Sequence, residues 1–409
     1  MRSIAKLMKD WQFTGPDGVT AAVALPHTWN AVDGQDGGND YWRGTCTYCP
    51  PFEAPALYPA QQQVWPQFEG GNASPPLLLN SPHLCPPDGR YPTFRAEITE
   101  LLQAENQLTV QVDNSVNDRV YPQKADFTFY GGIYRDVSLL VVNKNHIALG
   151  HFGDTGVKIT PTLKEGSADI QVETLVEGEG TVAVELLDAE GNSVARSEGE
   201  KASLHLDAPH LWNGVKDPYL YTCIVRLLQD GKPVDEVTTK VGIRSFSVDA
   251  KKGFFLNGKP YPLHGVSRHQ DRKGLGNAIT REMHDEDMAL IRELGANTVR
   301  LAHYQHDQYF YDLCDKYGMV VWAEIPYISE HLPNGRENTI SQMKELIHQN
   351  YNHPSIVCWG VSNEITISTK DKADMLDNHH ELNDLCHKMD PTLIQLQQLI
   401  SPLLGTGVP

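Results

Sequence analysis

Residues 352–364, with the sequence NHPSIVCWGVSNE, contain the clearest signal of the fold. The run 356–361 is almost wholly apolar and follows Pro354, which is typical of a parallel strand covered on both faces. Polarity changes at Ser362, and in a (β/α)₈ barrel the carboxyl ends of the strands form the floor of the active site. Glu364 is therefore the first catalytic candidate, although an Asn-Glu pair alone can simply open a polar loop.

From about residue 248 onward, apolar strands alternate with helical segments, which predicts the first half of a (β/α)₈ TIM barrel over 248–409. The predicted strands span 263–266, 298–302, 319–323 and 356–361. Asp307 can cap the second helix and Gly318 can end it. The first helix is expected to turn Met288, Ile291 and Leu294 toward the core.

The chain before residue 248 is predicted to be all-β, in two domains. Short strands separated by turn residues predict a jelly-roll β-sandwich over 1–143, and alternating strands predict an immunoglobulin-like β-sandwich over 144–247 with Trp212 in its core. The segment 50–92 is rich in proline, which cannot donate to a strand ladder. An edge loop and a locally scrambled sequence both remain open for that segment.

Composition excludes several classes of partner. The 409 residues carry a formal net charge of -18 and no apolar run near the roughly 20 residues that span a bilayer, so neither nucleic acid nor membrane is an expected partner. The first ten residues lack the apolar core of a secretory signal, and the 7 cysteines are an odd number suited to reduced thiols. We therefore expect a cytoplasmic location. Cys46 and Cys49 have metal-ligand spacing, but no second pair follows them, so a zinc site is disfavoured.

Polar groups follow each of the four predicted barrel strands. They are Arg268 and His269, then Arg300, His303 and Tyr304, then Glu324, and finally Asn363 and Glu364. Cations and carboxylates gathered at one face shift each other's pKa values, which is what acid–base chemistry requires. This arrangement favours a catalytic interpretation of Glu364 over a plain loop.

Three motifs in this region resemble glycoside hydrolase family 2, the family of β-galactosidases and β-glucuronidases. They are the segments 265–269, 295–304 and 352–364, which match that family's barrel motifs in order and spacing. The resemblance implies a jelly-roll sugar-binding domain, an immunoglobulin-like domain and a TIM barrel. It also implies that Glu364 is the general acid/base and that Asn363 contacts the sugar's 2-hydroxyl.

The resemblance further implies a sugar pocket. His269, Arg300, His303 and Glu324 would shape it, and Asp126 would reach it from the first domain. The implied function is a retaining exo-β-glycosidase of the β-galactosidase type, with galactose preferred to glucuronic acid and with a possible homo-oligomer as the assembly. The alternatives are a β-glucuronidase, a non-catalytic sugar-binding fragment and, last, a half-barrel assembly scaffold.

Two departures from the family pattern matter. Magnesium, which some family members bind, needs a histidine two residues after Glu324, where this chain has Pro326. The pattern also fades over 393–409, and the family nucleophile resembles a Glu on a seventh strand that is not readable here. We therefore expect that residues 1–409 alone do not turn over glycosides, and that an open barrel edge exposes Val357 and Val361.

Overall fold

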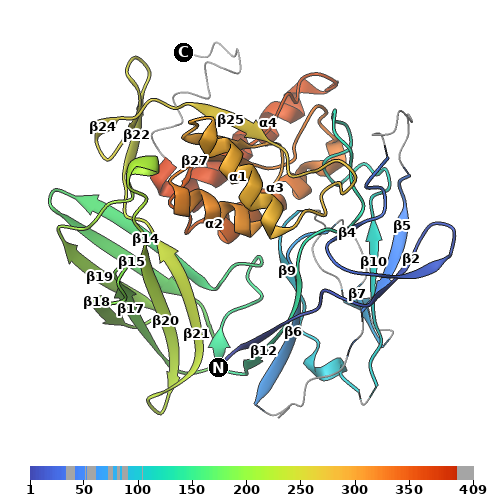
Figure 1. Cartoon of the computed structure of the whole chain (residues 1–409), viewed down its shortest axis with the longest axis horizontal. Helices are drawn as coiled ribbons and strands as arrows, with labels where there is room; N and C mark the ends of the chain where they lie inside the picture. The colour runs from blue at the N-terminus through green and yellow to red at the C-terminus, as the bar shows by residue number, and fades with distance from the viewer. Residues whose placement is uncertain are drawn as a thin grey trace.

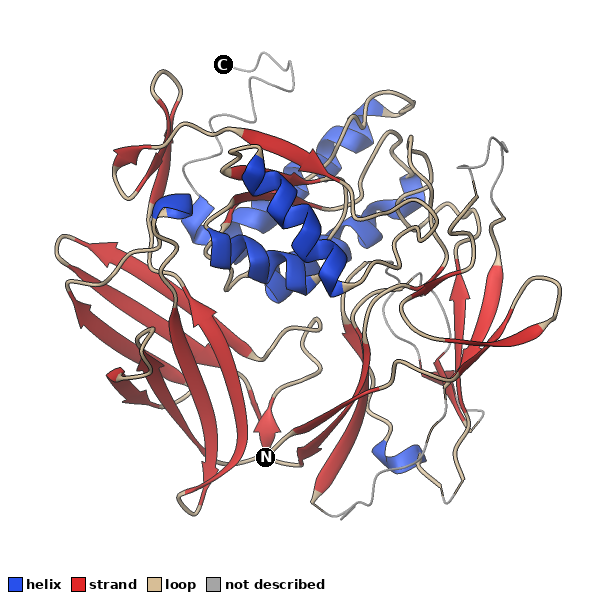
Figure 2. Cartoon of the chain, viewed as in Figure 1, coloured by secondary structure: helices blue, strands red, loops and turns tan. Residues whose placement is uncertain are grey.

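The structure is a computed structural model that describes residues 1–33, 42–50, 52, 61–71, 77–80, 83–84, 91–103 and 105–393. Much of the proline-rich segment, Cys85 and the tail after residue 393 therefore lie outside the described residues. Two sheet-rich regions stand on either side of the lower part of the molecule, and the helices gather above and between them (Figures 1 and 2). The N-terminus lies at the base, between the two regions.

The first region, at the right of Figure 1, contains two main antiparallel sheets. One has the order β1 (Ser3–Lys6), β12 (Val137–Asn143), β6 (Gln62–Phe68) and β9 (Phe94–Arg95). The other has the order β3 (Thr20–Val23), β2 (Trp11–Thr14), β5 (Thr45–Cys49), β10 (Leu108–Asp113), β7 (Leu77–Leu79) and β8 (His83–Leu84). A small pair joins β4 (His27–Thr28) to β11 (Gly132–Ile133), and η1 spans Thr99–Leu101. Apolar residues of both main sheets share one core.

Part of the proline-rich segment is a strand, not a loop. Pro66 lies inside β6 opposite Leu139 of β12, and its carbonyl accepts a hydrogen bond from the Ala96 amide at 3.3 Å. In an antiparallel ladder the N–H and C=O of one residue point to the same neighbour. The donor that proline lacks therefore faces the side of β9, which is only two residues long, so the sheet loses little. Cys46 and Cys49 lie on β5 three residues apart and so on opposite faces, which does not suit a shared metal.

The second region, at the lower left of Figure 1, also has two antiparallel sheets around one core. Their orders are β14 (Val157–Lys164), β15 (Ser167–Thr174), β19 (Lys201–Asp207), and β18 (Ser193–Glu198), β17 (Thr181–Leu187), β20 (Tyr221–Gln229), β21 (Lys232–Val241). The pair β13 (His146–Ile147) and β16 (Val176–Glu177) and the turn η2 (Gly214–Lys216) complete it. Trp212 is fully buried, but it packs against Phe254 and Val357 of the following region instead of joining this core.

A short antiparallel sheet leads into the parallel one. It consists of β22 (Phe246–Asp249), β23 (Gly253–Leu256) and β24 (Lys259–Pro260). The parallel sheet then has the order β25 (Gly265–Arg268), β26 (Thr298–Leu301), β27 (Val320–Glu324) and β28 (Ile356–Gly360). The helices are α1 (Arg281–Glu293), α2 (Gln308–Tyr317), α3 (Arg336–Asn350) and α4 (Lys372–Met389), with η3 at Pro333–Gly335 and η4 at Pro391–Leu393. These are the predicted four βα units.

Local sequence signals fix the ends of α2. The Asp307 side chain accepts a hydrogen bond from the Tyr309 amide at 2.9 Å, as an N-cap does, and Gly318 ends the helix with φ 73°. A Cβ on Gly318 would lie 2.2 Å from the Gly214 carbonyl, so this position also requires glycine for space. Two expectations were wrong: the first strand starts two residues later than predicted, at Gly265, and Leu294 is 74% exposed.

The expected exposed edge on the fourth strand is also wrong. Val357 is only 5% exposed because it packs in the cluster that contains Trp212, and Val361 is half-buried against the barrel core. The Arg244 guanidinium donates to the carbonyls of Pro354 at 3.0 Å and Ile356 at 2.8 Å. Side chains from the end of the second region therefore cover both the apolar surface and part of the backbone of β28.

Candidate active site

Polar side chains from three neighbouring strands meet at the carboxyl ends of the parallel sheet. Arg300 of β26 donates from Nε to Glu324 Oε2 at 3.0 Å and from Nη2 to the same oxygen at 2.9 Å. The same Nη2 donates to Asn363 Oδ1 at 2.8 Å, and His303 Nδ1 bonds Glu324 Oε1. The structure thus brings together four of the predicted site residues, which lie as far as 63 positions apart in the chain.

Glu324 is the buried centre of this cluster. Its side chain is 0% exposed, whereas Arg300 is 30% and His303 15% exposed. A buried carboxylate needs paired charges and hydrogen bonds, and here both of its oxygens receive them. Gly360 of β28 leaves the necessary room, because a Cβ there would lie 2.7 Å from the Glu324 Cβ.

Glu364 lies just beyond β28 and is exposed to solvent. Its backbone has φ 47°, a left-handed conformation that non-glycine residues rarely adopt outside constrained sites. The residue before it is fixed on both sides, since the Asn363 amide donates to the Tyr327 carbonyl at 2.9 Å and the Ser329 amide donates to the Asn363 carbonyl at 3.1 Å. Glu364 is therefore presented from an ordered strand end, without a direct bond to the Arg300 and Glu324 pair among the hydrogen bonds of the described residues.

The first β region reaches this end of the sheet through the segment around Asp126. Phe127 lies 5.0 Å from the His269 ring and 6.3 Å from the His303 ring, measured between centroids. Asp126 is exposed and close enough to His269 to raise its pKa, but burial dominates and, with the His303 charge, lowers that pKa below the usual histidine value. Phe127 thus brings the segment that contains Asp126 up to the two histidines, and the part of Asp126 in the sugar pocket stays a prediction.

Arg268 is not part of this surface. It is 6% exposed, its Nη2 pairs with Asp287 of α1 at 2.7 Å, and its guanidinium lies 3.9 Å from the centre of the Phe310 ring. Since β25 starts later than predicted, Arg268 falls inside the strand and points to the helices. Arg268 is therefore a structural residue. His269, which follows β25 directly, is the residue at this strand end that faces the site.

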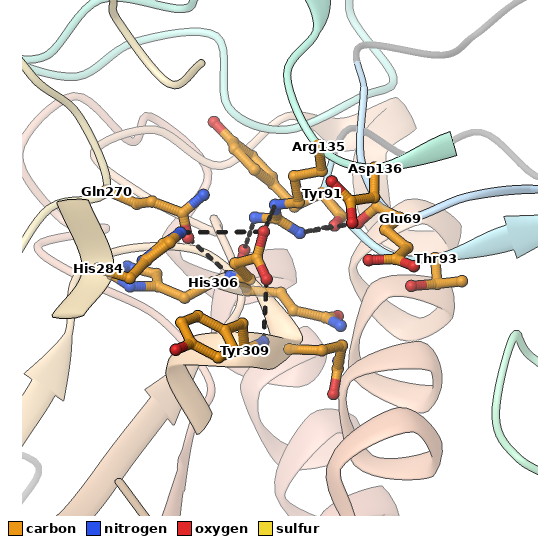
Figure 3. A network of polar contacts seen from close by, with 12 residues as sticks. Glu69, Tyr91, Thr93, Arg135, Asp136, Gln270, His284, His306 and Tyr309 are labelled. Carbon is orange, nitrogen blue, oxygen red and sulfur yellow. Dashed lines mark hydrogen bonds and ion pairs between the residues drawn. The ribbon is translucent and has the colours of Figure 1, made fainter. Parts of the chain in front are cut away.

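A second polar network lies between the first β region and the barrel helices (Figure 3). Figure 3 shows Arg135 and Tyr91 on one side and Gln270, His284 and His306 on the other. The Arg135 guanidinium donates to the carbonyls of Tyr91 at 2.6 Å and Gln305 at 2.7 Å, which ties the two parts together through buried hydrogen bonds. This network holds the first β region against the barrel region.

The residues present do not fit a magnesium ion at Glu324. Both of its carboxylate oxygens already accept from Arg300 and His303, and a guanidinium repels a divalent cation. Pro326 stands where the family pattern has a histidine ligand and offers no side-chain donor atom. We therefore derive no chemistry through magnesium at this position.

Two further side chains at the site escaped the sequence analysis. Trp322 is 37% exposed and its ring lies 5.3 Å from the Arg300 guanidinium, and Phe127 faces the two histidines. Strand alternation could have identified Trp322, because residues 322 and 324 of one strand point to the same face. Phe127 carried no such signal, since the packing of one domain's loop on another is not encoded locally.

Comparison with protein families gives two matches. Residues 247–398 match the model of the glycosyl hydrolases family 2 TIM barrel domain, and residues 151–244 match that of glycosyl hydrolases family 2. A β-glucuronidase of Bacteroides fragilis is 38% identical over 94% of this chain, and a β-galactosidase of Thermoanaerobacter pseudethanolicus is 29% identical over 90%. The chain spans 59% and 50% of these two relatives.

Solved structures resemble the chain over nearly its whole length. An FMN-binding β-glucuronidase from Facaelibacterium prausnitzii L2-6 superposes with a TM-score of 0.92 at 41% identity, covering 96% of this chain and 63% of that one. A β-glucuronidase of Bacteroides uniformis gives a TM-score of 0.87 at 30% identity, with 96% and 52% covered.

Proposed function

Because the chain belongs to the glycosyl hydrolases of family 2, we propose that it forms the sugar-binding and proton-donating half of a retaining exo-β-glycosidase, with a β-glucuronide as substrate. The observation that carries the proposal is the arrangement at the strand ends, where Glu364 follows Asn363 and Asn363 is bonded to Arg300. The proposal includes the domain types: residues 1–143 form a jelly-roll domain and residues 144–247 form an immunoglobulin-like domain. The expected cytoplasmic location stays a prediction.

Each residue of the cluster has a role that its environment suits. The Asn363 amide nitrogen and the Arg300 guanidinium are donors that can bind sugar hydroxyls, while Glu324 holds Arg300 and His303 in place. Glu364 is exposed and, in its protonated form, donates its proton to the glycosidic oxygen as the bond to the anomeric carbon breaks. Trp322 offers an apolar face beside Arg300 for the sugar ring.

The relatives support a glucuronide better than the galactoside that the sequence alone favoured. Two relatives that match with 38% and 35% identity are named as a β-glucuronidase and a putative one, whereas two relatives named as β-galactosidases match at 29% each. A glucuronide carries a carboxylate at C6, so its binding requires a cation that galactose does not need. Galactoside specificity is the second candidate.

Retaining hydrolysis requires a second carboxylate about 5–5.5 Å from the first, which attacks the anomeric carbon. At the strand ends that the structure describes, the other carboxylate is Glu324, and its two oxygens are bonded to Arg300 and His303. A carboxylate held in this way is a poor nucleophile. We therefore expect residues 1–409 by themselves to bind the sugar without turnover.

The test uses purified residues 1–409 with phenyl β-glucuronide and phenyl β-galactoside. Calorimetry is expected to show binding of the glucuronide. Arg300→Met should weaken this binding at least about tenfold, a loss of about 1.4 kcal/mol in binding free energy. The matched control is Arg196→Met, an exposed arginine paired with Glu185, which should bind as the parent does. Tighter binding of the galactoside would reverse the substrate assignment, and turnover that disappears in Glu364→Gln would show that a nucleophile is present within these residues.

A further inference from the structure

A cluster of side chains that could bind a metal ion lies away from the strand ends and consists of His151, Asp154 and His348. It joins the loop between β13 and β14, which carries His151 and Asp154, to the last turn of α3, which carries His348. The proposed active site does not use any of the three residues. The loop belongs to the second β region and α3 belongs to the barrel region, so an ion bound by the three residues connects these two regions.

The candidate ligand atoms converge on one carboxylate oxygen. His151 Nδ1 lies 2.9 Å and His348 Nδ1 lies 3.5 Å from Asp154 Oδ2, and the donor atoms of the three residues all lie within 4.8 Å of one another. In a tetrahedral zinc site with bonds of about 2.0–2.1 Å, the ligand atoms are about 3.3 Å apart. The observed separations bracket this value, so small side-chain movements suffice to surround an ion.

The three side chains are held in place before any ion binds. The second oxygen of Asp154 accepts from the Gly156 amide at 2.8 Å, and its carbonyl accepts from the Arg95 guanidinium at 2.6 Å. Phe152 stacks on the His348 ring with 4.8 Å between centroids and 3° between planes. Hydrogen bonds from outer residues that orient the ligands are typical of protein metal sites.

The remaining space suits an added ligand. His151 lines a pocket of about 290 Å³ together with Ser341 and Glu345 of α3. Glu345 is 3% exposed, and its Oε2 has no hydrogen-bond partner among the described residues. A buried acceptor without a donor normally indicates water or an ion nearby. The pocket therefore gives room for water next to His151.

We propose that His151, Asp154 and His348 bind a divalent transition-metal ion, with zinc as the ion their chemistry fits best. Two imidazoles and one carboxylate are a ligand set that zinc accepts, and water completes the tetrahedron. The partial exposure of the side chains, 37% for His151, 13% for Asp154 and 26% for His348, gives the ion a path from solvent. The bound ion would link the loop between β13 and β14 to α3.

Another cluster with a similar composition shows what separates a binding site from a structural one. Asp312, Asp315 and His353 also lie close together. There, however, the carboxylate that bonds His353 at 2.6 Å and the Ser355 amide at 3.1 Å belongs to Asp315, which is only 3% exposed. The cluster of Asp312, Asp315 and His353 holds the residues just before β28 in place.

The test measures zinc binding to untagged residues 1–409 after removal of metal with a chelator. Calorimetry should show one equivalent of zinc bound, and cobalt should give the visible absorption of a tetrahedral ion without a thiolate charge-transfer band. His348→Gln, His151→Gln and Asp154→Asn should each weaken zinc binding by more than the roughly 10–100-fold that loss of an outer partner costs. Zinc should raise the melting temperature of the parent and not of these variants.

The matched control is His210→Gln, which removes an exposed histidine paired with Asp217 at 2.7 Å but without a third ligand. It should bind zinc as the parent does. His348→Gln changes a partly exposed side chain, and circular dichroism will show whether it keeps the parent's fold. The proposal is rejected if the folded parent binds no zinc, or if the three variants and the control bind it equally.

Discussion

Two buried glutamates in the barrel region differ in what surrounds them. Glu324 at the strand ends is 0% exposed and receives hydrogen bonds from Arg300 and His303. Glu345 on α3 is 3% exposed and receives one from the Ser341 hydroxyl at 3.0 Å, while its other oxygen has no partner among the described residues. Burial raises the pKa of Glu345 to about 7, against the weaker opposing effect of Ser341.

The difference separates two uses of a buried carboxyl group. The first is a charged anchor that orients cations at a pocket, and the cations compensate the loss of its hydration. The second is only about half ionised at pH 7, because burial disfavours its charged form. Burial alone therefore does not identify a functional glutamate, whereas the groups that face it do.

The largest expected effect comes from removing the cation beside Glu324. Arg300→Met leaves a buried carboxylate with one weaker partner and should lower the free energy of unfolding by about 3 kcal/mol, the low end for a broken buried pair, because Arg300 is 30% exposed. Urea denaturation at pH 7.5 measures it. Arg196→Met, which breaks an exposed pair with Glu185, should cost no more than about 1 kcal/mol. Equal costs for the two variants would remove the contrast between buried and exposed pairs.

A smaller effect, of opposite sign, is expected at Glu345. Its folded-state pKa of about 7 lies above the usual value, so the folded state holds the proton more tightly and this stabilising contribution is lost as pH rises from about 4.5 through 7. Glu345→Gln has no carboxyl group to titrate, so it avoids this loss. The free energy of unfolding of the variant minus that of the parent should therefore be on the order of 2–3 kcal/mol larger at pH 8 than at pH 4.5.

The measurement for Glu345 is urea denaturation of parent and variant at both pH values. Glu337→Gln, an exposed glutamate on the same helix, is the control and should show no such difference between the two pH values. A parent and a Glu345→Gln variant with parallel pH profiles would show that Glu345 is not the group responsible.

The smallest effect concerns the single partner of Glu345. Ser341→Ala removes the hydroxyl that donates to Oε1 at 3.0 Å and should cost about 0.5–1.5 kcal/mol at pH 8, where the carboxyl is largely charged. The hydrogen bond lowers the pKa of Glu345, so its loss should raise that pKa. The decline in stability should then extend to a higher pH in the variant than in the parent. Thermal melting over a pH series records both changes, and an unshifted midpoint would argue against the contact.

Much of the barrel region and of the strand-end cluster was predictable from the sequence. Apolar runs identify the strands beside α2, and the N-cap Asp307 and the C-cap Gly318 identify the ends of α2. These signals depend only on the local backbone conformation and can therefore be read from the sequence. Arg300, Glu324 and Asn363 could be grouped because parallel strands carry their carboxyl ends to one edge. The place of Asp126 came from the family resemblance and not from any such pattern.

What the sequence could not reveal depends on contacts between distant segments. Glu345 lies near Arg95 and Phe94 in one pocket, about 250 positions away along the chain, so no local period indicates that it is buried. The cover over Val357 comes from Trp212 for the same reason. The grouping of His151 with His348 likewise depends on how the loop between β13 and β14 packs against α3.

The cover on β28 bears on how the chain unfolds. Arg244 and Trp212 precede the barrel in sequence, yet they hold the backbone and side chains of β28, and the Gly242 Cα lies where an added Cβ would come within 2.6 Å of Pro354. A boundary drawn near residue 247 thus separates segments that stabilise one another. In a native-state hydrogen-exchange experiment, the amides of Trp212 and of β28 would open together as one cooperative unit, because Trp212 is buried in one cluster with Val357 and Cys358 of β28.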